Sequence, residues 1–305
     1  MGMIRRGIGF GWSGVAALTG LVLPGECAGC GGPGGGFAGS AGGSPGRNSG
    51  RIPGSSPGNG YRGGSSGVCA TCASVLTGRP FPVRLPQGRT GLQAVYALSR
   101  YQDPVSELVI AQKEHGRLDL ARPLGRALAT VVEAVLAETL FAGTVPGGAI
   151  PAETVLGRTV PAGAVQIDTA SEEPVFLVPI PSSKAAERRR GQDPVLRMAR
   201  VAAASLRRAG IRAEVLRALR HNRIVADQVG LSSRDRMANL AGSMSVGAAA
   251  RRVLSGPSPG FTVLLDDVCT SGATLLEGAR ALRSIPGLDA PVRRPAAAVL
   301  AGPVR

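Results

Sequence analysis

Two adjacent acids, Asp266 and Asp267, stand between a short apolar run and a loop of small and hydroxyl residues. The run 261–265 reads FTVLL and follows a Gly- and Pro-containing stretch, which is typical of a buried strand of a parallel sheet. The loop Thr270–Thr274 precedes apolar residues at helical spacing: Leu275, Leu276, Ala279 and Leu282. The sequence therefore predicts a strand–loop–helix unit with two carboxylates at the carboxyl end of the strand.

This unit carries the chemical groups that bind a sugar phosphate. The first N–H groups of a helix have no partner within the helix and lie at the positive end of its dipole. A turn of small residues brings such groups around a phosphate, and the hydroxyls of Thr270, Ser271 and Thr274 add donors. Open α/β sheets bind ligands at the carboxyl ends of their strands, where carboxylates suit ribose hydroxyls or hydrated Mg²⁺.

The acid pair also fits two other interpretations. One is an ordinary buried strand whose terminal acids are solvated. The other is the Walker B strand of an ATPase, which requires a partner G-K-[ST] loop. The only lysines, Lys113 and Lys184, follow Gln112 and Ser183, so the sequence contains no such loop.

Four of the five cysteines form two C-x-x-C pairs, Cys27/Cys30 and Cys69/Cys72. This spacing predicts two zinc knuckles that share one tetrahedral four-cysteine site, a small structural zinc ribbon. The Gly-, Ser- and Pro-rich stretch 31–67 is interpreted as a disordered insertion, which closes at small entropic cost. The alternative is two disulfides in a secreted protein. Cys269 has no partner in the sequence, and its position in the phosphate loop favours a small spacer over a nucleophile.

Length and charge set broad limits. The 305 residues suffice for one large or two small domains, and the net charge is +15. Of the 35 basic residues 33 are Arg, which favours bidentate phosphate contacts, although a codon bias toward Arg explains much of this total. No run of 18 apolar residues predicts a transmembrane helix. The first residues resemble a signal peptide only weakly, so we expect an amphipathic helix over 1–26 and a cytoplasmic protein.

The segment 184–236 holds 14 Lys and Arg residues against five Asp and Glu residues. A basic lobe of net charge +9 beside a sugar-phosphate site would neutralise a diphosphate. It could equally be a solvated basic face or a nucleic-acid surface, since charge alone does not separate these functions.

Further elements follow from the apolar patterns. Strands are predicted within 93–98, 175–181 and 292–301, and helices over 101–114, 118–140 and 194–209. The Pro-rich stretch 77–91 is interpreted as a linker, and 141–174 as a flexible insertion. The predicted order is thus an N-terminal helix (1–26), the zinc ribbon (27–76), the linker (77–91) and an α/β domain (92–305).

Several landmarks, taken together, resemble the ComF-type competence family, whose members are phosphoribosyltransferase-like. The acid pair and its loop resemble the phosphoribosyl-diphosphate (PRPP) motif of type I phosphoribosyltransferases over about thirteen residues. The remaining landmarks are the two cysteine pairs, Tyr96, the helix ending in Lys113, Val178–Pro181 with Arg188–Gly191, and Arg217, Arg220, Arg223, Gln228, Arg236 and Asn239.

The resemblance implies a type I phosphoribosyltransferase fold, with a mostly parallel sheet, flanking helices and a flexible hood. It implies that Asp266 and Asp267 hold the ribose hydroxyls and Mg²⁺, with Val268 beside them. The resemblance further implies that the 5-phosphate is held by Thr270, Ser271, Gly272, Ala273 and Thr274. It implies that the diphosphate is held by Ser182, Ser183, Lys184, Arg188 and Arg190. The implied partners are PRPP or a related ribose phosphate and, in DNA uptake, single-stranded DNA or a helicase.

Two departures from the family pattern bear on activity. Gln192-Asp193-Pro194 stands where the family favours Phe-Asn-Gln. Thr270 stands where purine-salvage relatives carry an Asp that acts as general base. His115 and His221, the other groups that titrate near neutral pH, lie on polar or basic segments. Two functions therefore stay open: transfer of phosphoribose to an unidentified acceptor, and non-catalytic binding of a nucleotide or single-stranded DNA.

Overall fold

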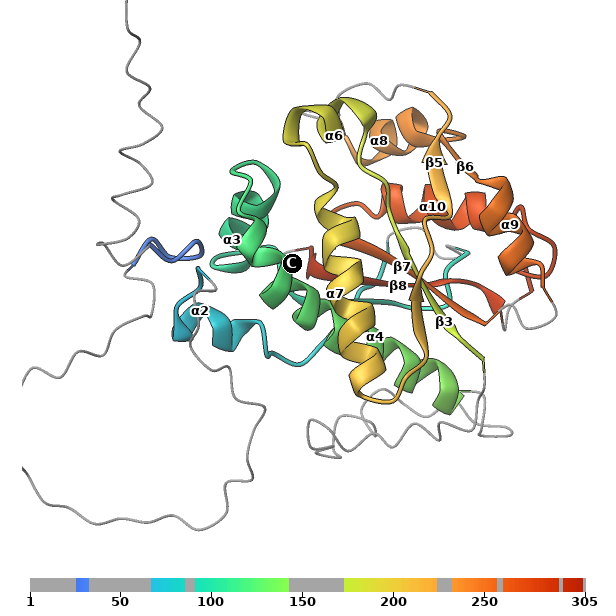
Figure 1. The fold of residues 1–305 in the computed structure, drawn as a ribbon. Helices are drawn as coiled ribbons and strands as arrows, with labels where there is room; N and C mark the ends of the chain where they lie inside the picture. Colours follow the sequence, from blue (N-terminus) through green and yellow to red (C-terminus); the bar gives the residue numbers. More distant parts are fainter. Residues whose placement is uncertain are drawn as a thin grey trace, which may run out of the picture.

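The structure is a computed structural model that describes residues 26–32, 67–85, 91–142, 173–223, 232–256, 260–290 and 293–303. The predicted N-terminal helix lies outside this range apart from Glu26, as do most of the two predicted insertions. The described part is a mixed α/β fold built on a mostly parallel six-stranded sheet with flanking helices (Figure 1).

The strand order in the main sheet is β1-β2-β8-β7-β3-β4. All neighbouring pairs are parallel except the edge pair β1–β2, which is antiparallel. β7, which precedes the phosphate loop of the sequence, lies between β8 and β3. The strands are β1 (Phe81–Pro82), β2 (Val95–Arg100), β3 (Val175–Pro179), β4 (Ala213–Val215), β7 (Phe261–Val268) and β8 (Ala296–Gly302).

Two helices cover one face of this sheet. α4 (Ala121–Ala142), which follows the short 3₁₀ helix η1 (Leu118–Leu120), packs against α7 (Pro194–Arg208) and against β2 and β8. Figure 1 shows α4 and α7 side by side across the strands. Side chains at alternate positions of β7, Val263 and Leu265, are fully buried in this layer because successive strand residues point to opposite faces.

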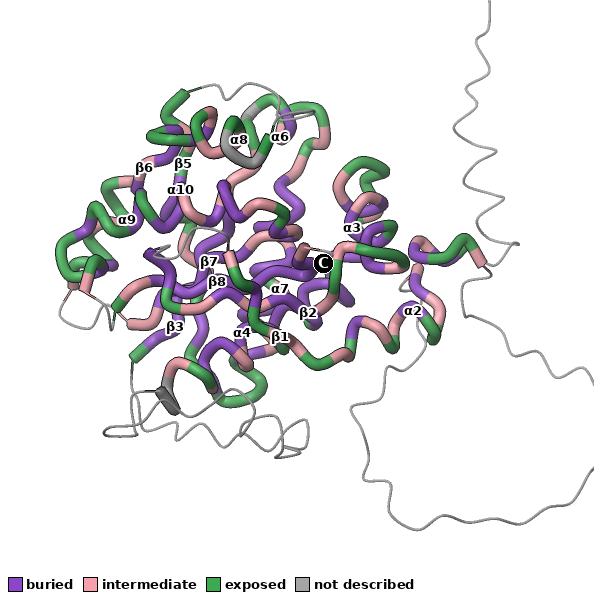
Figure 2. Tube along the Cα trace, turned by 180° about the vertical axis from the view of Figure 1, so that it is seen from behind, coloured by how far each residue is buried: buried purple, intermediate pink, exposed green. Residues whose placement is uncertain are grey.

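The opposite face is covered by α10 (Ala273–Leu282) and a small antiparallel sheet of β5 (Leu219–His221) and β6 (Met244–Val246). Leu264 of β7 belongs to this second core cluster, together with Leu275 and Leu282 of α10. α8 (Ser233–Leu240) and α9 (Ala248–Leu254) lie outside this layer, and Figure 2 shows much of α9 as exposed.

A smaller unit joins the first face near the carboxyl ends of the strands. This cysteine unit contains the four cysteines and α2 (Ala70–Val75), and it packs against α3 (Val105–Lys113). Its buried residues Cys27 and Cys72 share one cluster with Leu108 of α3 and with α4. α6 (Lys184–Arg190) stands close to α8 at another part of the same end of the molecule (Figure 1).

Most of the predicted elements are present, with shifted boundaries. β7 continues through Val268, so both acids belong to the strand instead of following it. The segment interpreted as a linker contains β1, which pairs with β2. The helix predicted over 101–114 begins only at Val105, and the helix predicted from 118 opens with a 3₁₀ turn.

Glu277 fastens the small sheet to α10. Its side chain is buried and accepts hydrogen bonds from the Met244 backbone N–H at 2.8 Å and from Arg280 at 2.8 Å. Burial opposes ionisation, but the Arg280 guanidinium and the Met244 N–H outweigh it and lower the pKa of Glu277 below its ordinary value of 4.5.

We expect Glu277→Gln to destabilise the protein by about 1–2 kcal/mol near neutral pH, because it weakens charged hydrogen bonds in a buried place. A folded-state pKa below 4.5 means that this stability is present above pH 4.5 and is lost as the pH falls through the folded value. Urea unfolding of both proteins between pH 7 and pH 3 measures the difference. Glu107→Gln, at an exposed helix position, is the control, and a gap independent of pH would contradict the assignment.

Candidate functional site

The acid pair lies near the carboxyl end of the central strand β7, and its two side chains differ in environment. Asp267 has the register of Val263 and Leu265 and is only 3% exposed, while Asp266 is half-buried. Asp266 Oδ1 accepts a hydrogen bond from the Asp267 backbone N–H at 2.9 Å. Burial and the charge of Asp267 raise the pKa of Asp266 well above 3.8.

Lys113, at the end of α3, pairs with Asp267. Its Nζ lies 3.0 Å from Asp267 Oδ2 and 3.3 Å from Oδ1, across 154 positions of sequence. Burial by itself lowers the pKa of Lys113, but the charges of Asp267 and Asp266 outweigh it and raise the pKa above 10.5. The sequence indicated Lys113 only as a landmark at a helix end, and its contact with the acid pair was not predicted.

The loop after β7 brings backbone donors to the same end of the sheet. Gly272 has a φ of +75°, and a Cβ there would lie 2.6 Å from Leu85 Cδ2, so a side chain has neither the conformation nor the space. Within the described residues, the Ala273 N–H contacts only Ser271 Oγ, at 3.4 Å, and no acceptor is seen for the N–H groups of Ser271 and Thr274. The Gly272 N–H of the same turn donates to the Cys269 thiol, so the N–H groups of Ser271 and Thr274 are the donors at the start of α10 that a bound anion could use.

Cys269 is buried within this loop. Its backbone N–H donates to Ala301 O, and its side chain is 1% exposed. Burial, together with the charge of Asp266, raises the pKa of the thiol to about 12, which leaves it un-ionised at neutral pH.

The predicted diphosphate loop lies beside β7, because the Ile180 N–H at the end of β3 donates to Leu265 O at 2.9 Å. Ser183 caps α6 by accepting from the Ala186 N–H, and Ser182 Oγ lies 3.5 Å from Asp193 Oδ1. Lys184 is the first residue of α6. The sequence did not predict this helix or the capping role of Ser183.

The two arginines predicted for this loop differ. Arg188 is exposed, whereas the Arg190 side chain is only 13% exposed and pairs with Glu114 at 3.2 Å. The acid pair, the Gly272 loop and the loop after β3 thus share one end of the sheet. A separate surface hollow is lined by Val83–Leu85 and Leu92–Val95, and it contains none of these residues, although Leu85 contacts Gly272.

The arginines of the predicted basic run have protein partners. Arg220 donates to Ser245 Oγ, Arg223 donates to Asn239 O, and Arg217 lies 4.0 Å from Glu187. All three are exposed, so they combine structural contacts with a positive surface around β5. Gln228 lies outside the described residues.

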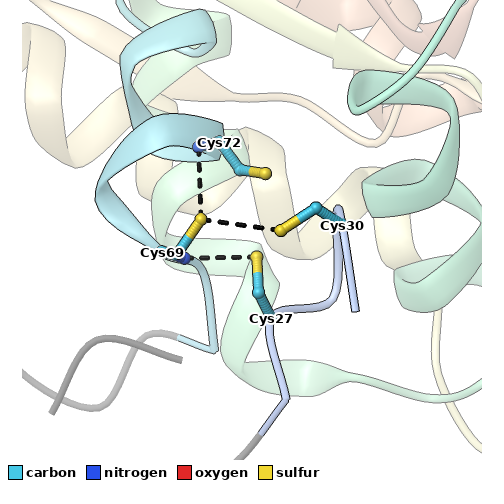
Figure 3. A group of neighbouring side chains, drawn as sticks. All are labelled: Cys27, Cys30, Cys69 and Cys72. Atoms are coloured by element: carbon cyan, nitrogen blue, oxygen red, sulfur yellow. Dashed lines mark hydrogen bonds between the residues drawn. The ribbon is translucent and has the colours of Figure 1, made fainter. Parts of the chain in front are cut away.

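The four cysteines of the two C-x-x-C pairs converge on one point, as Figure 3 shows. Their Sγ atoms all lie within 4.8 Å of one another, and Cys30 Sγ is 3.7 Å from Cys69 Sγ. Four thiolates bound tetrahedrally to one zinc ion at about 2.3 Å are about 3.8 Å apart, so the cluster fits this metal.

Backbone N–H groups donate hydrogen bonds to the cysteine sulfurs and so favour their thiolate form. Cys27 Sγ accepts from the N–H groups of Cys69 and Gly29, at 3.2 and 3.4 Å, and Cys69 Sγ accepts from the Cys72 N–H at 3.5 Å. Burial opposes ionisation of Cys27, but these donors lower the pKa of its thiol to about 6. Such N–H contacts support sulfur ligands of a structural metal.

The cysteine unit also packs against α3. A Cβ at Gly29 would lie about as close to Leu108 Cγ and Pro104 Cβ, at 3.2 Å each, as to Cys72 Sγ, at 3.1 Å. The unit is therefore in direct contact with the helix that carries Lys113.

Comparison with known proteins gives no family for this chain: no protein-family model matches the sequence, and no curated protein matches it significantly. None of the described helices combines the length and hydrophobicity that a membrane crossing demands.

We expect the purified protein to contain about one zinc ion per chain, and Cys72→Ser to lose most of it, because the site needs four sulfur ligands. Inductively coupled plasma mass spectrometry gives the zinc content. Amide exchange of 105–113 should accelerate with the loss, since α3 rests on this unit. Cys269→Ser, which removes the fifth cysteine, should keep its zinc. Full zinc retention by Cys72→Ser would contradict the site.

Proposed function

We propose that this chain binds PRPP or a related ribose phosphate and belongs to the ComF-type, phosphoribosyltransferase-like group that its motifs resemble. The observation that carries the proposal is the position of Asp266 and Asp267. They lie at the carboxyl end of the central parallel strand, directly before a small-residue loop whose N–H groups open α10. Ligands of open α/β sheets bind at this place.

In this proposal the two ends of the ligand meet different groups. Asp266 and Asp267 hold the ribose hydroxyls, and the backbone and hydroxyls of the loop Thr270–Thr274 hold the 5-phosphate. The loop Ser182–Lys184, with Arg188 and Arg190, receives the diphosphate. Support comes from the hydrogen bond between β3 and β7, which sets the two loops side by side at one end of the sheet.

Transfer of phosphoribose would break the bond between ribose C1 and the diphosphate oxygen, which keeps the electron pair, while a nitrogen of the acceptor bonds to C1. Mg²⁺ bound with PRPP would supply charge neutralisation to the leaving diphosphate. The protein's part is electrostatic: the cations of the diphosphate loop stabilise the departing anion, and the acid pair orients the sugar. Thr270 has no acid–base function at neutral pH, so in this step the acceptor nitrogen attacks through its lone pair and gives up any proton it carries to water.

A second candidate function is binding of a nucleotide or single-stranded DNA without catalysis, as an accessory factor in DNA uptake. Arg188, Arg189, Arg217, Arg220 and Arg223 are all exposed on α6 and around β5, and such a surface attracts phosphate backbones. Aromatic residues, which form stacking platforms for single strands, make up only 3% of the chain. We therefore rank ribose-phosphate binding first. Salt-sensitive oligonucleotide binding would favour the second function.

Calorimetric titration with PRPP and Mg²⁺ tests the first function. We expect binding by the parent protein and a loss of roughly 30-fold or more in affinity for Asp267→Asn, because a buried charged partner of the ligand is removed. Asp119→Asn, which alters an exposed acid paired with Arg117, is the matched control and should bind like the parent. Absence of PRPP binding by the folded parent would refute the proposal. Diphosphate release with candidate bases then distinguishes transfer from binding.

A further inference from the structure

Two adjacent residues of opposite charge at the end of α3 each hold a charged group of the proposed site. Lys113 pairs with Asp267 of β7 at 3.0 Å, and Glu114 pairs with Arg190 of α6 at 3.2 Å. The partners come from segments 154 and 76 residues away. The end of α3 therefore neutralises two charged groups of the proposed site. One is Asp267, which would bind the sugar or its cation, and the other is Arg190, which would bind diphosphate.

These four groups form one electrostatic cluster. Arg190 is near enough to Lys113 for its charge to oppose protonation of that amine, while Asp267 and Asp266 favour it. Both pairs have one partner sheltered from water: the Asp267 side chain is 5% exposed and Arg190 is 13% exposed, against 42% for Lys113 and 54% for Glu114. The groups on α3 are thus the solvent-accessible members and can leave, whereas the groups of the site stay in place.

Two buried side-chain donors, one in this cluster and one on α3, have no acceptor within the described residues. Arg190 Nε and Gln112 Nε2 are buried and have no hydrogen-bond partner within the described residues. Gln112 precedes Lys113 on α3 and is only 3% exposed. A buried N–H group without an acceptor is costly, and such groups in native proteins often await a ligand or water. Of the two, Arg190 belongs to the cluster with Lys113, and its unpartnered Nε favours a ligand rich in oxygen atoms.

α3 itself is fixed. Its first turn packs on the cysteine unit through Pro104 and Leu108 against Gly29, and Val105, Leu108 and Val109 are buried. Rotation of the Lys113 and Glu114 side chains is therefore the easier way to uncover the site than movement of the helix.

We propose that Lys113 and Glu114 are a charge latch, which pairs with Asp267 and Arg190 in the free protein and releases both when a phosphorylated ligand binds with its divalent cation. This inference rests on the proposed function. A ligand that brings a cation to Asp267 and an anion to Arg190 replaces both lost pairs, and the freed Lys113 gains the anion as a new partner. A cation alone or an anion alone has to displace one pair without that compensation, so the latch selects for the combined ligand.

The latch is tested with the two charges presented separately to the full-length protein. Glu114→Gln frees Arg190, so inorganic diphosphate without divalent metal should bind about two- to fivefold more tightly, the size expected for an exposed ion pair. Lys113→Met frees Asp267, so Mn²⁺ alone should bind roughly tenfold more tightly, as expected for a competitor coupled to the same group. Calorimetry measures the diphosphate, and paramagnetic relaxation of water measures Mn²⁺.

Matched controls are Glu107→Gln in the first turn of α3 and Arg122→Met on α4, both at exposed positions, which should leave both affinities at the parent value. Circular dichroism and the melting temperature establish that each variant is folded. Failure of either gain in a folded variant overturns the latch. PRPP binding by the parent is scored separately: gains without PRPP binding would sink the proposed function alone, and PRPP binding without the gains would sink the latch alone.

Discussion

An ionised carboxylate buried at the end of a strand needs a counter-charge. This constraint links the central strand β7 to α3 and, through α3, to the cysteine unit. Asp267 is 3% exposed, and desolvation of an ionised carboxylate is expensive unless it is paired. Lys113 supplies the charge. For the lysine to reach β7, α3 has to end at the carboxyl edge of the sheet, and the packing of α3 against the cysteine unit holds it there. The cysteine unit, although distant from β7 in sequence, thus helps to keep Lys113 beside Asp267.

The alternation of side chains along β7 explains why two neighbouring acids behave differently. Val263, Leu265 and Asp267 share the face covered by α3 and α4, so Asp267 meets the lysine. Asp266 has the register of Leu264, on the face of α10. Its pKa is raised by burial and by Asp267, so it is the member of the pair that gains most from a cation or a hydroxyl donor. Separating the acids in this way pairs Asp267 with Lys113 in the free protein and leaves Asp266 more open to a ligand.

Local patterns were sufficient for part of this arrangement. The apolar run 261–265 and the spacing of Leu275, Ala279 and Leu282 predicted the strand and helix around the loop, and the C-x-x-C spacing predicted the cysteine cluster that the structure contains. The strand boundary was placed too early because charged residues normally end a buried strand, whereas here Lys113 compensates Asp267. The pairs Lys113–Asp267 and Glu114–Arg190 and the small sheet β5–β6 join distant segments, and no periodicity in one segment specifies its partner in another.

The burial of the cysteines bears on the role of their unit. A ribbon that reads nucleic acid presents basic or aromatic side chains around its metal. Here Cys27 and Cys72 are each 2% exposed and belong to the core cluster of α3 and α4, and Cys30 is the exposed member. Of the described residues in 26–32 and 67–76, none is basic or aromatic. Exposed arginines occur elsewhere in the described fold, among them Arg79 just beyond this unit, Arg188 and Arg189 on α6, and Arg217, Arg220 and Arg223 around β5. Structural support of α3, and through it of Lys113, is therefore the role that the position of the cysteine unit favours.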